Sequence, residues 1–431
     1  MKLKISTFLI FFMILNFIST VSALENLPDA NNLRTLSDYL QYAALRNAAL
    51  EASFQNFKAA LEQVPQAKSL PDPKFTYGYF IREVETRVGP QEQKFGIMQV
   101  FPWFGTIEAR TGSAAAQAKA AKKRYDAEKL KLFWKVKEAF YEYVYLASAV
   151  DIAKQNLELL KHFEEVARTR YAAAAGGHPD VIRAQVELAK LEDILKSLEK
   201  LREPTVARLN AVLNRQSSEM LGWPEKEEFK LPKVDRQKVI TILRQTNPEL
   251  AAIDFEVAEA QSKVELAKRK FYPDIGVGVE WIETGSAVGS GVSGSGEDPL
   301  VLMFSMNLPI WTGSYKAAER QAQSNVIKAR QQRTEAENTI LARAEQVLYD
   351  FEDSNRKIML YADVLIPKAD ELLEASEGAY RGGSVDFLSL VDAQRMKLDF
   401  QLKYERAVTD SQQKLAELEM LVGTELSTMT D

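Results

Sequence analysis

SAAAQAKAAKKRYDAEKLKLFWKVKEAFYEYVYLASAVDIAKQNLELLKHFEEVARTRYAAAA, residues 113–175, contains neither glycine nor proline. The stretch is rich in Ala, Lys, Glu and Leu, and its apolar residues recur every three or four positions, which predicts one continuous α-helix. At 1.5 Å per residue this helix would be about 95 Å long. Because such a helix cannot fold back into a compact domain of this mass, we expect long helices that lie side by side as an elongated hairpin or bundle.

The residues after this stretch predict a helical hairpin. Gly176-Gly177-His178-Pro179 would end the helix, and Asp180 would start a return helix. A second long helix begins near Ser314, and Gly382-Gly383-Ser384 would turn it back in the same way. Pro367 interrupts this second helix once and should kink it, because proline lacks the amide hydrogen that a helix interior needs.

The two hairpins belong to a duplicated unit. Tyr171 precedes Gln185 by the same interval at which Tyr380 precedes Gln394, and three earlier landmarks recur in the same order. These landmarks are Arg46–Ala52 and Thr246–Ala252, Pro71-Asp72 and Pro273-Asp274, and Phe101–Gly105 and Leu308–Gly313. We therefore expect a signal peptide (1–23), a first repeat (24–220), a linker (221–234), a second repeat (235–424) and a C-terminal tail (425–431).

Each repeat should contain a helix, two strands and two long helices, in that order. In the first repeat the strands are predicted at about 74–82 and 93–101, and the long helices at about 105–175 and 179–215. In the second repeat the strands are predicted at about 274–283 and 300–309, and the long helices at about 313–381 and 385–422. The predicted fold class is therefore mainly α with a small β part.

The first residues are predicted to be a signal peptide. Lys2 and Lys4 precede an apolar core at 8–18, and Val21-Ser22-Ala23 supplies the small residues of a cleavage site. This core is too short to span a bilayer, which takes roughly twenty apolar residues. Export with cleavage after Ala23 is expected, and an uncleaved anchor is the alternative.

The composition excludes several classes of function. The 431 residues include 55 Lys+Arg, 60 Asp+Glu, two His and no Cys, for a net charge of -5. An acidic chain has no electrostatic reason to bind nucleic acid. Without cysteine, and with only His162 and His178 as imidazoles, we expect no catalytic residues, no metal and no cofactor. If the protein encloses a tunnel, the excess of acidic residues would favour cations over anions inside it.

The predicted strands have the pattern of strands that span a membrane. They are about nine residues long, with aromatic residues near their ends. The alternating residues are Phe75, Tyr77, Tyr79 and Ile81 in the first repeat and Ile275, Val277, Val279 and Trp281 in the second. The alternative is a small soluble sheet that caps a helical rod. Four strands cannot close a barrel, and an open sheet edge cannot face lipid, so several chains would have to share one barrel.

Seven short motifs stand in order along the duplicated chain: Arg208–Leu213, Asn247–Leu250, Phe271–Asp274, Leu308–Trp311, Ala379–Gly383, Leu390–Gln394 and Leu418–Gly423. Together with the predicted signal peptide, these motifs resemble those of the TolC-type outer membrane efflux protein family. The resemblance covers essentially the whole mature chain. In addition, Leu70–Pro73 looks like the members that accompany heavy-metal exporters.

The resemblance implies a homotrimer in which each chain contributes four strands to a twelve-stranded β-barrel, surrounded by lipid of the outer membrane of a Gram-negative bacterium. The duplicated long-helix hairpins would form an α-helical tunnel through the periplasm. Such a protein is not an enzyme but the exit duct of a tripartite efflux or type I secretion system. It works with a periplasmic adaptor protein and an inner-membrane transporter, expected to be of the RND rather than the ABC type. The cargo stays open among drugs, metal cations, siderophores and proteins.

The resemblance also implies where the passage narrows. Family members close at the periplasmic tip, commonly with aspartates just after the second turn. Here Ser389 stands at the first of these positions and Asp392 at the second, with Asp180 as its counterpart in the first repeat and Asp386 in the turn. A ring of identical carboxylates on a trimer axis would attract cations and narrow the pore. The alternatives are an N-cap role for Asp180 and a solvated helix face for Asp392.

The two turns are also the expected docking surface for the adaptor. The residues concerned are Tyr171, Gly176, Gly177, His178, Tyr380, Arg381, Gly382, Gly383 and Val385. For the glycines the alternative is a role in the turn backbone, and for the aromatic residues it is helix packing. For the whole chain, the alternative function is a secreted coiled-coil scaffold protein that dissolves without detergent.

Overall fold

The computed structural model describes residues 33–226, 228–231 and 234–426, so the predicted signal peptide at 1–23 lies outside the described residues. The helices are α2 (Leu36–Arg46), α3 (Ala48–Lys68), α4 (Thr106–Ala172), α5 (His178–Leu213), α6 (Arg236–Thr246), α7 (Pro248–Arg269), α8 (Thr312–Leu360), α9 (Ile366–Gly382) and α10 (Phe387–Val422). The strands are β1 (Lys74–Thr86), β2 (Gly89–Phe101), β3 (Ile275–Thr284) and β4 (Leu300–Met306). The predicted fold class, mainly α with a small β part, is confirmed.

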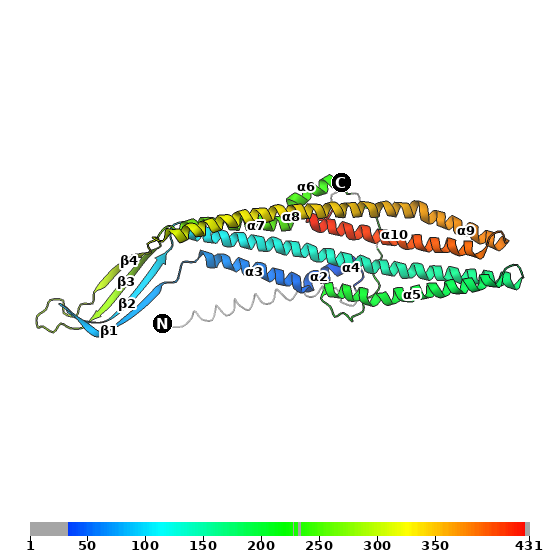
Figure 1. The fold of residues 1–431 in the computed structure, drawn as a ribbon. Helices are drawn as coiled ribbons and strands as arrows, with labels where there is room; N and C mark the ends of the chain where they lie inside the picture. The colour runs from blue at the N-terminus through cyan, green and yellow to red at the C-terminus, as the bar shows by residue number, and fades with distance from the viewer. Residues whose placement is uncertain (1–32, 227, 232–233, 427–431) are drawn as a thin grey trace, which may run out of the picture. The chain divides into compact units, whose positions relative to one another are not determined.

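The chain divides into two compact units. Figure 1 labels the helices and strands in chain order. Unit 1 comprises the described chain up to Ala52, Ala127–Asn247 and the described chain from Ile340. Unit 2 comprises Ser53–Asp126 and Pro248–Thr339. Helix α4 belongs to both units, and its 67 residues make it about 100 Å long. Within the described residues, no helix combines the length and the apolar character needed to cross a membrane.

In unit 1 the two helical hairpins share one apolar core. Figure 1 shows that α4 and α5 run antiparallel to each other, as do α9 and α10. Buried residues of both hairpins form one cluster, which consists of Ala153, Leu157, Leu160, Phe163, Ala167, Val181, Ala184, Leu191, Leu373, Tyr380, Phe387, Leu390, Val391 and Ala393. Because this cluster draws on both repeats, packing between the repeats stabilises each hairpin.

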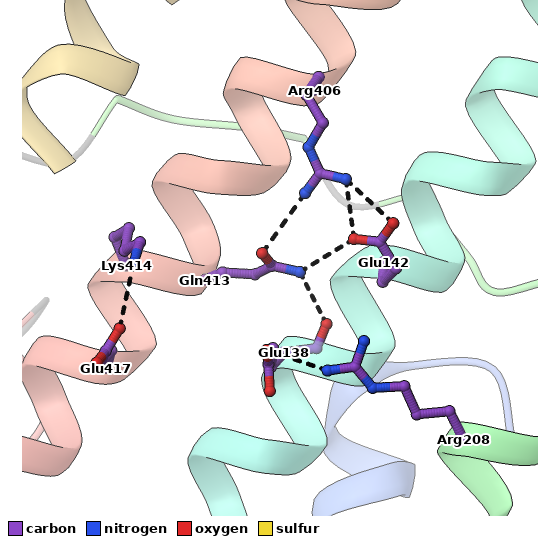
Figure 2. Close-up of polar contacts among 7 residues, drawn as sticks. All are labelled: Glu138, Glu142, Arg208, Arg406, Gln413, Lys414 and Glu417. Carbon is purple, nitrogen blue, oxygen red and sulfur yellow. Dashed lines mark hydrogen bonds and ion pairs between the residues drawn. The ribbon is translucent and has the colours of Figure 1, made fainter. Parts of the chain in front are cut away.

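Polar contacts join α4, α5 and α10 elsewhere in unit 1, as Figure 2 shows. The guanidinium of Arg406 on α10 donates to Glu142 of α4 at 2.9 and 3.1 Å. Gln413 donates to the main-chain oxygen of Glu138 at 3.0 Å, and Arg208 of α5 donates to the Glu138 carboxylate at 3.1 Å. Partly buried polar groups need partners, so these contacts favour one register of the three helices over others.

The sequence predicted one helix before the strands of each repeat, and this prediction is wrong because the structure has two. Asn47 separates α2 from α3, and Asn247 separates α6 from α7. Both asparagines have non-helical backbone, and their side chains donate to main-chain oxygens near the end of a return helix: Asn47 to Val212 at 3.0 Å and Asn247 to Leu421 at 2.8 Å. The sequence pattern does not predict these two breaks, because the carbonyls that the asparagines bond to lie far away in the sequence.

We expect Asn247→Ala to lower the free energy of unfolding by about 1–3 kcal/mol, because the main-chain oxygen of Leu421 would lose a buried donor. The side chain of Asn247 is almost fully buried. Chemical unfolding of the detergent-purified protein, followed by circular dichroism, measures the change. Gln245→Ala, on the exposed side of α6, serves as the control and should leave the unfolding curve in place. Equal curves for both variants would contradict the proposed anchoring role of Asn247.

Pro367 interrupts the second long helix differently from the predicted kink. Tyr361–Leu365, just before the proline, form a π-helical segment, and Pro367 lies in the first turn of α9. Proline is tolerated in a first turn because the amide hydrogen that it lacks would have no helical partner there. The predicted helix at about 313–381 is therefore α8, a π-helical segment and α9.

Unit 2 contains a four-stranded antiparallel sheet in the order β1-β2-β3-β4. β1 and β2 have 13 residues each, more than predicted, because their pairing continues to a tight turn at Arg87 and Val88. β4 is shorter than predicted and ends at Met306, before Pro309, which has no amide hydrogen for a sheet. Since the strand order follows the chain, β1 and β4 form the two edges.

Candidate functional site

One face of the sheet carries apolar side chains on every strand. The antiparallel register aligns them in rows, of which Phe75, Ile97, Val279 and Leu302 form one. The other rows are Tyr77, Phe95, Trp281 and Leu300; Val277 and Phe304, with the polar Gln99 beside them; and Phe101, Ile275 and Met306. Many of these side chains are exposed, for example Phe75 at 69% and Phe304 at 72%. An apolar face of this extent needs an apolar partner.

The opposite face of the sheet consists largely of small and polar residues. It includes Lys74, Thr76, Gly78, Lys94, Gly96, Gly276, Gly278, Glu280 and Ser305, together with the apolar residues Met98, Val100, Ile282, Val301 and Met303. Lys94 and Glu280 form an ion pair at 3.2 Å between β2 and β3. A Cβ atom on Gly276 would overlap the Ser305 hydroxyl, so glycine leaves room for the neighbouring side chain. The sheet therefore has one face suited to lipid and one suited to water.

Aromatic residues border the sheet where strands lead into helices. The rings of Trp103 and Tyr272 stack with centroids 5.2 Å apart, and the Trp103 amide donates to Asp274 at 3.1 Å. Gly105 has a φ of +80°, and a Cβ atom there would lie 3.1 Å from the guanidinium carbon of Arg269, so this junction requires glycine. Tryptophan and tyrosine at such a border are typical of a membrane–water interface.

In unit 1, Arg170 connects the turn between α4 and α5 to the end of α9. Its guanidinium donates to the main-chain oxygens of Tyr380, of Arg381 at 2.7 Å and of Ala175 at 2.6 Å. It also lies over the Tyr380 ring, 4.7 Å from the centroid. A cation is favoured at these positions, because the last carbonyls of a helix carry partial negative charge.

Tyr380 was predicted to be an exposed docking residue, and this prediction is wrong. Its side chain is 2% exposed and packs against Phe387, with ring centroids 5.3 Å apart. Its hydroxyl donates to Asp180 at 3.3 Å. Burial, followed by the negative charge of Asp180, raises the pKa of Tyr380 to about 12, so the phenol stays protonated at neutral pH. We call Arg170, Asp180 and Tyr380 the tip latch.

Two of the predicted gate residues, Asp386 and Ser389, bond to each other at the start of α10. Asp386 is the N-cap of α10, and its carboxylate accepts hydrogen bonds from the Ser389 amide at 3.1 Å and the Ser389 hydroxyl at 2.8 Å. These bonds hold the pKa of Asp386 below its usual value. The alternative prediction of an N-cap role for Asp180 is wrong, because Gly177 is the N-cap of α5 and Asp180 lies in the first turn.

Asp392, another predicted gate residue, has an exposed carboxylate. It belongs neither to the Asp386 cap nor to the tip latch. It lies on α10 and pairs with Arg395 at 3.3 Å, and Arg395 also contacts Glu187 of α5 at 2.6 Å. The equal spacing between tyrosine and glutamine in the two repeats aligns Asp392 with Arg183 and aligns Asp180 with Ser389. Asp180 is therefore not the counterpart of Asp392, and the two repeats carry opposite charges at this position.

Several other predicted docking residues are exposed at the turns. Tyr171 is 48% exposed and contacts the His178 ring with centroids 5.2 Å apart, while Val385 is 36% exposed. The exposed Arg381 contacts Glu377 at 2.5 Å and His162 at 2.9 Å. These side chains are accessible to another protein at the two turns.

The glycines of the two turns differ in their backbone roles. Gly382 is the last residue of α9, and Gly383 follows it with a φ of +76°, a conformation that favours glycine. In the first turn the left-handed residue is Ala174, with a φ of 57°, rather than Gly176 or Gly177. The left-handed backbone therefore favours glycine at position 383. Gly176 and Gly177 do not have this conformation.

Sequence reasoning missed Arg170, although it is the central residue of the tip latch. Arg170 lies within an uninterrupted helical pattern. From such a pattern, a basic residue is predicted to be exposed to solvent and to have no special role. The second repeat has Ala379 at the equivalent place, directly before Tyr380. That difference between the repeats is the signal that could have distinguished Arg170 from the other cations of α4.

Comparisons with known proteins agree with this arrangement. A family model described as "Outer membrane efflux protein" matches residues 39–215 and 239–424. Nodulation protein T of Rhizobium leguminosarum bv. trifolii is 22% identical over 405 residues, which cover 90% of this chain and 85% of that protein.

Two solved structures have the same fold. The outer-membrane channel OprN is 18% identical with a TM-score of 0.72, over 90% of this chain and 89% of that chain. The outer membrane protein VceC from Vibrio cholerae is 16% identical with a TM-score of 0.72, over 90% of this chain and 96% of that chain.

Proposed function

This chain belongs to the outer membrane efflux protein family, and from that membership we propose that it is the exit duct of a tripartite efflux or type I secretion system. Its place is the outer membrane, with an extension into the periplasm, and it is a channel protein rather than an enzyme. Cargo would pass through the duct passively, and a transporter in the inner membrane would supply the energy.

The observation that carries the proposal is the two-faced sheet with free edges at β1 and β4. An edge strand cannot face lipid, because its amide and carbonyl groups would have no partners. Pairing β4 of one copy with β1 of the next would remove every edge, turn the apolar face to lipid and enclose the polar face. With three copies, the number that the family resemblance implies, the ring would contain twelve strands.

We propose that Asp392 forms the narrowest ring at the periplasmic tip. Of the four candidate gate residues, Asp386 and Ser389 bond to each other and Asp180 accepts from Tyr380. Asp392 keeps an exposed carboxylate, and Arg395 beside it would reduce its negative potential. Asp180 would then act indirectly, because it holds Tyr380 and thereby the second hairpin.

The exposed residues of the two turns would bind a periplasmic adaptor protein. Tyr171, His178 and Val385 offer aromatic and apolar surface, and Arg381 adds a cation. An exposed mixture of aromatic, apolar and arginine side chains is typical of protein interfaces. For the inner-membrane partner we propose an RND-type transporter, as the family resemblance implies. The string Leu70–Pro73 looks like the family members that accompany heavy-metal exporters.

Planar-bilayer conductance of the detergent-purified mature protein tests the duct. We expect small, cation-selective openings, and Asp392→Ala should enlarge them and reduce their selectivity, because it removes a ring of carboxylates. The control is Asp399→Ala, which removes an exposed aspartate from the same helix. Insertion with equal conductance in both variants would exclude Asp392 as the gate. Failure to insert, together with solubility in plain buffer, would favour a secreted scaffold protein instead.

A further inference from the structure

A polar groove of about 440 Å³ lies in unit 2, between α3, α4, α7 and α8. Each helix contributes four residues at positions i, i+3, i+4 and i+7, so one face of each helix lines it. The lining residues are Asn56, Ala59, Ala60, Gln63, Gln117, Ala120, Ala121, Arg124, Glu256, Glu259, Ala260, Lys263, Asn325, Lys328, Ala329 and Gln332. Contacts run from α3 to α4 through Ala60 and Ala121, and from α4 to α7 through Arg124 and Glu256. Asp254 and Arg333 then join α7 to α8 at 2.8 Å, so the helices follow the order of the strands.

The buried part of the groove is made of alanines. Ala60, Ala121, Ala260 and Ala329 are each less than a tenth exposed, one on each of the four helices. Ala60 and Ala260, and likewise Ala121 and Ala329, occupy equivalent positions in the two repeats. Small side chains at these four points let the helices approach closely, and the longer polar side chains stand around them.

Five side-chain amides line the groove: Asn56, Gln63, Gln117, Asn325 and Gln332. Within the part of the chain that the structure describes, none of these amide side chains forms a hydrogen bond with another protein group. An amide both donates and accepts, so the groove can bind ligands that carry both kinds of polar group.

The charges of the groove are not balanced. Both carboxylates are neutralised locally, because Glu256 contacts Arg124 and Glu259 pairs with Lys263 at 2.6 Å. Lys328 is exposed and, among the described residues, has no salt bridge to a carboxylate. With three cations and two carboxylates, the lining has a net charge of one positive unit per chain.

We propose that this groove is an anion-accepting station on the substrate path, where Lys328 attracts an organic anion and the surrounding amides hydrogen-bond to it. This inference rests on the proposed duct, because it takes the groove as part of the wall along which cargo passes. The ligand class is a polar organic anion with carboxylate, sulfonate or phosphate groups. The groove differs locally from the cation preference expected from the net charge of -5, because the local field in a groove depends on the charges that line it.

Equilibrium binding of pyranine, a polar trisulfonate, to the full-length mature protein in detergent tests the proposal. Fluorescence anisotropy should show saturable binding that weakens as salt is added. Lys328→Gln should weaken binding by about fivefold, as expected for the loss of one exposed charge pair. Gln332→Ala should weaken binding less, because it removes a neutral hydrogen bond.

Arg330→Gln is the matched control. It removes one cation from an exposed position of the same helix, and Arg330 does not line the groove. Binding equal to that of the unchanged protein is expected for this control. The proposal would be overturned by the absence of pyranine binding, or by equal losses in Lys328→Gln and Arg330→Gln. Bilayer conductance of the same preparation keeps the two ideas apart: conducting protein without pyranine binding removes the groove and leaves the duct.

Discussion

Leu302→Arg should prevent stable insertion of the protein into the outer membrane. Leu302 lies on the apolar face of β4, opposite Val279 in the register of the sheet. In the proposed barrel this face meets lipid, and an arginine near the middle of a bilayer costs about 2–4 kcal/mol per chain. Three chains in one barrel would each bear that cost. Membrane fractionation after urea washing, followed by bilayer conductance, measures the loss.

The neighbouring substitution Val301→Arg is the matched control for Leu302→Arg. Val301 is on the same strand but on the opposite face, where its register partner is Glu280. An arginine there would face water and could pair with that carboxylate, so insertion and conductance should survive. Equal tolerance of both substitutions would mean that the apolar face does not meet lipid, and the barrel would have to be abandoned.

Arg170→Ala should shift the protein toward an open periplasmic tip. The substitution removes the donor that the main-chain oxygens of Tyr380, Arg381 and Ala175 share. One hydrogen bond to a charged group contributes about 1.5–3 kcal/mol, so the open population should rise by about tenfold or more. Single-channel recordings should show more frequent and larger openings.

Arg168→Ala controls for the loss of a cation near the turn. Arg168 pairs with Glu164 on its own helix, so its removal leaves the contact between the hairpins intact. Recordings in which Arg170→Ala and Arg168→Ala behave alike would contradict the tip latch.

The pH dependence of the same recordings gives a second measure of the tip latch. The pKa of Tyr380 is raised from 10.0 to about 12, so the folded tip holds the phenol proton more tightly than the unfolded chain does. The resulting stabilisation is complete below pH 10.0 and is lost as the pH rises toward about 12. Openings should become more frequent over this interval, and Tyr380→Phe should abolish that change. A pH response that persists in Tyr380→Phe would belong to another group.

Local sequence patterns were sufficient for most of the fold. The absence of glycine and proline from 113–175 predicted α4, because helix formation depends on residues within a few turns of one another. The alternation around Phe75 and Val279 predicted strands, because successive side chains of a strand point to opposite faces. The equal spacing of landmarks in the two halves revealed the duplication, and their order carried the resemblance to the family.

The roles of single side chains depended on contacts between distant segments. Tyr380 has the same local pattern as Tyr171, yet it is buried because Arg170 and Asp180 of the other hairpin meet it. Asp386, a candidate gate residue, is also the N-cap of α10, and Asn47 and Asn247 bond to carbonyls at the ends of return helices. The charge of the groove likewise follows from which carboxylate each cation reaches. Helical periodicity indicates which residues share a face, but the relative register of helices far apart in the chain determines what that face meets.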